Sequence, residues 1–87
     1  MSVEYVLFMH SEVVETYRSL RRTEKDLLGQ FFDLLENYPT LEGETTERDD
    51  SGRTVQVKFV GKFKVVYWAD HPVKEIKILR LDRLPKR

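Results

Sequence analysis

The 87-residue chain contains no cysteine, only two histidines and only four glycines, each of which stands alone. Without cysteine it cannot build a disulfide framework, a thiolate zinc site or a cysteine nucleophile, and this composition is typical of a reducing cytoplasm. Isolated glycines also exclude a glycine-rich phosphate loop. No apolar stretch exceeds the length of Tyr5 to Met9, which is too short to span a membrane, and no basic segment precedes it as in a signal peptide. We therefore expect one cytoplasmic domain over residues 1–87, not associated with a membrane and without a small-molecule cofactor.

The few residues that could bind a metal ion or transfer a proton are not arranged for either task. His10 and His71 have no acidic or nucleophilic partner at a recognisable spacing, so we expect ordinary surface roles for both. The run from Asp49 to Gly52 is typical of a turn rather than a cation-binding loop. The sequence thus predicts no metal site.

The net charge of zero conceals a sharp split along the chain. Residues 1–50 carry five Lys or Arg against twelve Asp or Glu, whereas residues 51–87 carry ten against three. The basic half is also a continuous run of predicted strands with lysines at alternating positions, which favours an anion-binding face. Lysines on an open sheet face are equally common as aids to solubility and as guards against edge pairing. The sequence leaves both interpretations open.

Two helices are predicted in the acidic half. Ser11 can cap a helix over Glu12 to Leu20, and Thr23 with Asp26 resembles a capping box that begins a second helix. Pro39 ends that second helix. Because the two helices are joined by only a few residues, we expect an antiparallel hairpin. The apolar stripe of the second helix contains Leu27, Phe31, Leu34, Leu35 and Tyr38, widened by Leu28 and Phe32.

The predicted strands lie at the start of the chain and after residue 43. They are Val3 to Met9, Glu44 to Arg48 as a short edge strand, Thr54 to Val60, Lys62 to Ala69, and Lys74 to about Asp82. Gly61 lies at a hairpin. The alternation is confused at Leu79 and Leu81, which indicates a bulge or burial on both faces. The main elements follow the order β-α-α-β-β-β, which predicts an α+β fold with a helical hairpin packed on one face of a small, mainly antiparallel sheet.

Period-two alternation divides the strand residues between two faces. Val55, Val57 and Phe59 share one face of their strand, and we assign these valines to the core. The polar residues Gln56, Lys58, Lys62 and Lys64 are then expected together on the opposite face. Trp68 is the one aromatic residue that shares the lysine face. It has two open interpretations: a platform for a base or a protein, or a boundary residue covered by the C-terminal segment of the chain.

The run Gly61-Lys62-Phe63-Lys64-Val65-Val66-Tyr67, in this element order, resembles the RelE/ParE superfamily of toxins from type II toxin–antitoxin systems. The segment Glu36 to Pro39 also resembles that family. The resemblance implies one of two activities. RelE-like members cut mRNA in the ribosomal A site, whereas ParE-like members poison DNA gyrase without cleaving RNA. Either kind is held silent by a cognate antitoxin protein.

The resemblance also implies roles for basic residues of the predicted strands. The catalytic set would comprise Lys58, Lys64 and either Arg80 or Arg83, with RNA or partner contacts from Gln56, Lys62, Trp68, Lys77, Lys86 and Arg87. The sequence departs from the family pattern at three points, and each counts against the interpretation as a nuclease. Lys64 replaces the usual Arg, Gln56 replaces a lysine, and no Tyr follows the last strand. An apolar strip of Val60, Val66, Leu79 and Leu81 beside Trp68 could instead dock a partner. We predict a RelE-like mRNA endonuclease toxin, with a ParE-like protein-binding toxin or an inactive fold relative as the alternatives.

Overall fold

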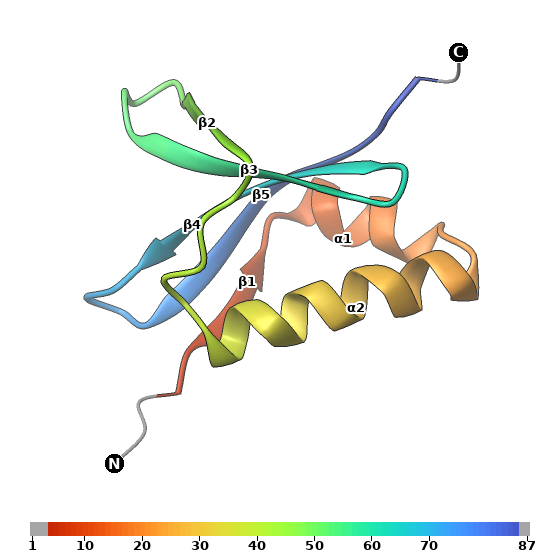
Figure 1. The fold of residues 1–87 in the computed structure, drawn as a ribbon, viewed down its shortest axis with the longest axis horizontal. Helices are drawn as coiled ribbons and strands as arrows, with labels where there is room; N and C mark the ends of the chain where they lie inside the picture. Colours follow the sequence, from red (N-terminus) through yellow and green to blue (C-terminus); the bar gives the residue numbers. More distant parts are fainter. Residues whose placement is uncertain (1–3, 86–87) are drawn as a thin grey trace.

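The protein is described by a computed structural model over residues 4–85 (Figure 1). Val3, Lys86 and Arg87, for which the sequence makes predictions, lie outside the described residues. Along the chain the elements are β1 (Val6–Met9), α1 (Ser11–Arg18), α2 (Arg22–Asn37), β2 (Thr45–Arg48), β3 (Thr54–Val60), β4 (Phe63–Asp70) and β5 (Glu75–Arg83). The predicted element order is confirmed, and the predicted edge strand is β2.

The strands form one sheet in the order β1-β5-β4-β3-β2. Strands β2 to β5 pair with their neighbours in antiparallel fashion, and β1 pairs in parallel with β5. The two helices lie on the same side of this sheet (Figure 1). The predicted α+β class, with a helical hairpin on one face of a mainly antiparallel sheet, is confirmed. Within residues 4–85, neither helix has the length and apolar character needed to cross a membrane.

Both helices begin slightly differently from the prediction. Ser11 is the first residue of α1, so His10 takes the cap position and makes no side-chain capping bond. Helix α2 begins at Arg22, and its preceding residue Arg21 donates its backbone N–H to Glu24 over 3.1 Å. The predicted capping roles of Ser11 and of the Thr23–Asp26 pair are therefore wrong. A carboxylate three residues after the cap satisfies the helix end, and Glu24 is in that place.

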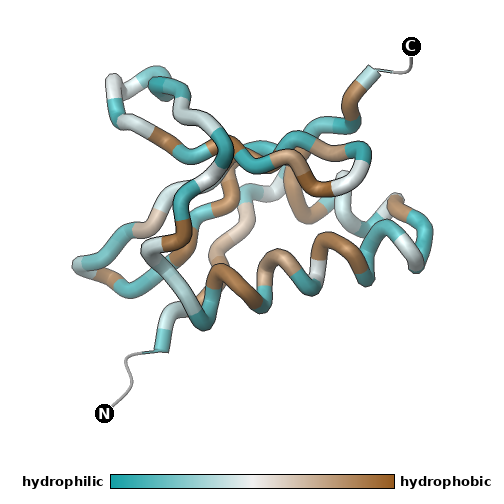
Figure 2. The backbone as a smooth tube through the Cα atoms, viewed as in Figure 1, coloured by the Kyte–Doolittle hydropathy of each residue, from teal (hydrophilic) through white to brown (hydrophobic). Residues whose placement is uncertain are grey.

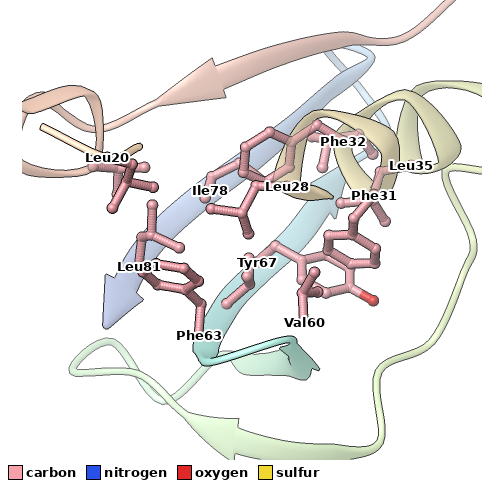
Figure 3. Close-up of a cluster of buried hydrophobic side chains, with 13 residues drawn as sticks. Leu20, Leu28, Phe31, Phe32, Leu35, Val60, Phe63, Tyr67, Ile78 and Leu81 are labelled. Atoms are coloured by element: carbon pink, nitrogen blue, oxygen red, sulfur yellow. The ribbon is translucent and has the colours of Figure 1, made fainter. Parts of the chain in front are cut away.

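The main core lies between α2 and the sheet (Figure 3). Phe31 packs edge-on against Tyr67, with ring centroids 5.6 Å apart. The buried stripe of α2 is Leu28, Phe31, Phe32 and Leu35. Figure 2 shows apolar segments recurring along α2. The predicted stripe was centred too far to one side, because Leu27 and Leu34 are each 43% exposed and Tyr38 is 61% exposed.

The uncovered side of the sheet, called the open face below, has a small core of its own. It consists of the buried Val55, Val57 and Val66, with the partly buried Trp68 and Leu79 packed against them. The strand pairing shifts between Val66 and Tyr67, which face Arg80 and Ile78, so Leu79 is the extra residue of a bulge. Leu81 belongs to the main core on the other side. The predicted bulge and the burial on both faces are both confirmed.

Gly61 makes the tight turn between β3 and β4. Its φ of +57° is a left-handed conformation that favours glycine, and a Cβ there would lie 2.7 Å from Leu27 Cδ2. The predicted hairpin at Gly61 is confirmed. This turn fixes the pairing of β3 with β4, on which the positions of Lys58 and Lys64 depend.

Candidate anion-binding face

The strand pairing separates lysines that the sequence placed together. Lys58 pairs with Val65, whereas Phe59 pairs with Lys64. Directly paired residues share a face of the sheet, and Val65 belongs to the helix-covered core. Lys58 therefore points to the helix side and Lys64 to the open face. The expectation that they share a face is wrong, because the valines of β3 that seemed to mark the helix side form the core of the open face.

The other two polar residues of that predicted group also lie away from the open face. Gln56 pairs with Tyr67 on the helix side, and its Oε1 accepts the backbone N–H of Gly43 over 2.9 Å. Lys62 is exposed in the β3–β4 turn, where its carbonyl accepts the N–H of Leu84 over 2.7 Å. Both contacts stabilise local structure. Of the predicted polar group, only Lys64 points to the open face.

On the open face, Lys64 and Arg80 form a cluster with two carboxylates. Lys64 Nζ donates to Glu47 Oε2 of β2 over 2.6 Å, and Arg80 donates to Asp82 over 2.7 Å. Asp82 is also the cross-strand neighbour of Lys64. The hydrogen bond from Lys64, and then the charges of Lys64 and Arg80, lower the pKa of Glu47 against the opposing effect of desolvation. The cluster thus holds an ionised carboxylate among cations contributed by two strands.

Arg83 belongs to the other side of the molecule. It pairs with Phe63, its guanidinium lies 4.8 Å from the Phe63 ring centroid, and it binds Glu24 of α2 at 2.8 and 3.2 Å. Hydrogen bonds from Arg83 and the Arg21 backbone hold the pKa of Glu24 at about 2. Of the two arginines that the sequence left open, Arg80 is therefore the one on the open face.

A groove of about 560 Å³ lies on the open face between the β2–β3 hairpin and the strands behind it. Its lining includes Glu47, Arg80, Trp68, Lys77 and His10. Lys77 Nζ forms an ion pair with Asp70 Oδ2 at 2.9 Å. Trp68 shares the open face with Lys64, as predicted, but it packs there against Val55 and Val57, which were expected on the opposite face. Lys77, for which the sequence predicted a contact but no particular face, pairs with Trp68 and lies on the open face as well. The groove also contains His10, for which the sequence predicted only a surface role.

Trp68 is covered in part by its own chain. The guanidinium of Arg53, the residue before β3, lies 3.9 Å from the Trp68 ring centroid, and Lys77 Nζ lies 5.4 Å from it. Leu79 of β5 packs in the same small core. Of the two interpretations of Trp68, the boundary residue describes the unbound protein. The cover comes from the β2–β3 hairpin as well as from the C-terminal strand that was expected.

Each of the four predicted catalytic cations has a carboxylate partner within 3.3 Å. The pairs are Lys58–Glu44, Lys64–Glu47, Arg80–Asp82 and Arg83–Glu24. Two of these carboxylates come from the acidic segment around β2, which folds against the basic strands. Three of the four pairs join a cation of the basic half to a carboxylate of the acidic half, so the fold brings the two oppositely charged halves into contact. Among the described residues, no group of three or more His, Cys, Asp or Glu side chains is placed to hold a metal ion.

Sequence reasoning missed Glu47, His10 and Arg53 as residues of this face. The sequence does contain one signal for Glu47. It lies in the predicted edge strand, two residues after Thr45, so the two side chains share one face of that strand. Its pairing with Val55 is what brings it to the open face. Nothing local in the sequence places His10 near Arg80, since their proximity depends on the parallel pairing of β1 with β5.

No protein-family model and no curated protein matches the chain. Solved structures do match. The RelE–RelB complex of the archaeon Pyrococcus horikoshii gives a TM-score of 0.77 at 23% identity, covering 98% of this chain and 100% of that one. The RelBE2 toxin–antitoxin complex of Mycobacterium tuberculosis gives 0.73 at 20% identity, covering 93% and 99%. The isolated RelE toxin of E. coli gives 0.69 at 11% identity, covering 95% and 87%. The chain therefore has the fold of the RelE toxins.

Proposed function

We propose that this chain is the toxin of a type II toxin–antitoxin pair, acting in the cytoplasm as a ribosome-dependent mRNA endonuclease. The observation that carries the proposal is the Lys64–Glu47–Arg80 cluster, which lies beside a groove on the open face of a RelE fold. The solved neighbours include RelE bound to RelB and the RelBE2 toxin–antitoxin complex. By analogy, a cognate antitoxin protein would keep this chain silent.

The cluster offers the groups that RNA cleavage through the 2′-oxygen requires. Glu47 is ionised and accepts the proton of the 2′-hydroxyl. The 2′-oxygen then bonds to phosphorus while the bond from phosphorus to the 5′-oxygen breaks, leaving a 2′,3′-cyclic phosphate and a 5′-hydroxyl. Lys64 and Arg80 stabilise the charge on the phosphorane oxygens. His10, which lines the same groove, protonates the departing 5′-oxygen.

The existing ion pairs do not prevent this chemistry. The side chains of Arg80 and Asp82 are 58% and 45% exposed, and exposed ion pairs contribute little free energy. A phosphate can therefore displace Asp82 from Arg80 and form the bidentate contact that a guanidinium favours. When a phosphate also engages Lys64, the bond that lowers the pKa of Glu47 weakens, so Glu47 becomes a stronger base.

The test is cleavage of translated mRNA after tightly controlled expression, mapped by primer extension. We expect Lys64→Ala, Arg80→Ala and Glu47→Gln each to reduce cleavage by about a hundredfold or more. Lys58→Ala is the matched control, because Lys58 lies on the other face and should leave cleavage unchanged. Intact cleavage by Lys64→Ala would overturn these roles. Growth should recover when the antitoxin is co-expressed.

A ParE-like toxin that acts by binding DNA gyrase is the second candidate. It is favoured by the residues that β3 presents on the open face, which are the apolar Val55, Val57 and Phe59 where a nuclease would gain from cations. On the same face Phe8, paired with Lys77, is 48% exposed. DNA supercoiling and gyrase-dependent breaks should be followed in the same cells. Breaks without mRNA cleavage would establish this candidate, and neither effect would indicate an inactive fold relative.

A further inference from the structure

Trp68 lies between two cations on the open face. On one side is the guanidinium of Arg53, 3.9 Å from the ring centroid, and on the other is Lys77, its cross-strand neighbour on β5. Within residues 4–85, the one ion-pair partner of Arg53 is Asp49 of the same hairpin, at 3.1 Å, and the Arg53 side chain is 44% exposed. Exposed contacts of this kind are weak. The guanidinium is therefore a readily displaced cover on the aromatic ring.

The indole nitrogen of Trp68 has no hydrogen-bond acceptor within residues 4–85. Nε1 is buried, and among the described residues it is the one buried side-chain polar atom without a hydrogen-bond partner. Such atoms are rare in folded proteins, because burying an unpaired donor costs free energy. Arg53 cannot satisfy Nε1, since a guanidinium carries only donors. While Arg53 lies over the ring, the N–H of Trp68 thus stays unpaired. A bound molecule with an oxygen acceptor would satisfy it.

We infer that an unpaired nucleotide of single-stranded RNA stacks on Trp68 in the place that Arg53 takes in the unbound protein. A base presents the same flat face as the guanidinium, and aromatic side chains are the usual platforms for unpaired bases. Once displaced, Arg53 binds the phosphate of that nucleotide with its two-pronged donor group. A ribose or phosphate oxygen accepts the hydrogen of Nε1.

This inference rests on the proposed function, because it uses the same face and the same class of substrate. Trp68 and Lys64 lie four residues apart on β4, roughly 13 Å along the strand, so both point to the open face. A single strand bound at the Lys64–Glu47–Arg80 cluster can therefore reach Trp68. Trp68 then acts as a binding residue that holds the strand beside the reacting phosphate.

The experiment uses Trp68 as its own reporter, since it is the only tryptophan in the chain. A short single-stranded RNA of mixed sequence is titrated into the purified full chain, and tryptophan emission and its quenching by acrylamide are followed. We expect saturable quenching of the emission by RNA and, at saturation, protection from acrylamide. The same RNA annealed to its complement should have little effect, because its bases are already paired.

Three variants sharpen the test, with affinity for a labelled RNA measured by anisotropy. Trp68→Leu should weaken binding by about tenfold or more, and Trp68→Phe should restore most of the loss, because stacking tolerates any aromatic ring. Arg53→Ala should make Trp68 more accessible to acrylamide without RNA, and RNA should remove that difference. Lys58→Ala, on the opposite face, is the control. Thermal melts identify any variant that fails to fold, and the wild-type titration needs no substitution.

The inference is overturned if saturating RNA leaves Trp68 emission and acrylamide access unchanged, or if Trp68→Leu binds RNA as well as the wild type. Protection of Trp68 by the antitoxin alone, without any response to RNA, would make this a protein-docking site instead and would equally overturn it. The experiments also distinguish a failure of this inference from a failure of the proposed function. A Trp68 that responds to RNA in a chain that cleaves no mRNA would refute only the nuclease, and mRNA cleavage with a silent Trp68 would refute only this site.

Discussion

The two faces of the sheet bury apolar side chains by different means. On the helix side, α1 and α2 pack on the sheet and share with it a large buried cluster that includes Phe63 and Tyr67. On the open face, the buried cluster formed by the described residues consists of Val55, Val57 and Val66, and side chains of the sheet itself, such as Trp68, cover it. Both faces follow the same period-two alternation. The difference shows that alternation assigns residues to two faces, whereas the neighbouring elements decide which face becomes the main core and which is left without a helical cover.

The largest expected effect comes from truncating the helix-side core. Phe63 is 1% exposed, so Phe63→Ala should lower the free energy of unfolding by about 3–5 kcal/mol, much of the total for a domain of this size. Phe59→Ala is the matched control, because Phe59 lies on the open face and is 39% exposed. It should cost less than about 1 kcal/mol. Urea unfolding measures both, and equal losses would contradict the contrast between the faces.

The small core of the open face is tested by Val57, which is completely buried. Val57→Ala should lower the free energy of unfolding by roughly 2 kcal/mol, from the lost methyl groups and the cavity left behind. Val73, a residue of the same type that is 56% exposed, provides the control substitution Val73→Ala, expected to lie within about 0.5 kcal/mol of wild type. If Val57→Ala behaves like that control in chemical denaturation, the open face has no core of its own.

Much of the fold could be predicted from the sequence, because it depends on local signals. The end of α2 before Pro39, the turn at Gly61 and the bulge at Leu79 each have a local cause in the sequence, and the structure confirms all three. The buried stripe of α2 was less predictable. Leu27 and Leu28 are neighbours of the same type, and only packing on the sheet shows that Leu28 is the buried one.

The candidate site was harder to predict than the fold, because it depends on pairing between distant segments. Both faces of β3 carry apolar residues, so Val55 and Val57 could not reveal on which side the helices lie, and Lys58 was placed with Lys64 in consequence. The partner of Lys64 is Glu47, 17 positions earlier, and it arrives through the pairing of β2 with β3. No local pattern encodes that contact.

Removing the hydroxyl group of Tyr67 from the helix-side core should have a smaller effect on the free energy of unfolding. Tyr67 donates its hydroxyl to the carbonyl of Leu41 over 3.0 Å. Tyr67→Phe should lower the free energy of unfolding by about 1 kcal/mol, the usual net value of a hydrogen bond lost without a change of shape. Thermal unfolding near neutral pH measures it. A loss as large as that of Phe63→Ala would mean that the hydroxyl does more than bind Leu41.

The same residue makes stability depend on alkaline pH. Burial raises the pKa of Tyr67 to about 12 from an ordinary value of 10. The folded state therefore holds this proton more tightly than the unfolded state, and the resulting stability is complete below pH 10 and is lost as the pH rises toward 12. Tyr67→Phe should lack this component of the alkaline loss. An identical decline in both proteins would contradict the assignment.

The smallest effect is expected at the rim of the helix side, where Glu24 of α2 binds Arg83 of β5. Because hydrogen bonds from Arg83 and the Arg21 backbone hold the pKa of Glu24 at about 2, against an ordinary 4.5, the pair stabilises the folded state above pH 4.5. That contribution is lost as the pH falls through about 2. Glu24→Gln should lower the melting temperature near neutral pH by at most a few degrees, since exposed ion pairs are weak. The melting curves of the two proteins should then converge toward pH 2. A difference that persisted unchanged at that pH would show that Glu24 acts through its neutral hydrogen bonds at the start of α2 rather than through its charge.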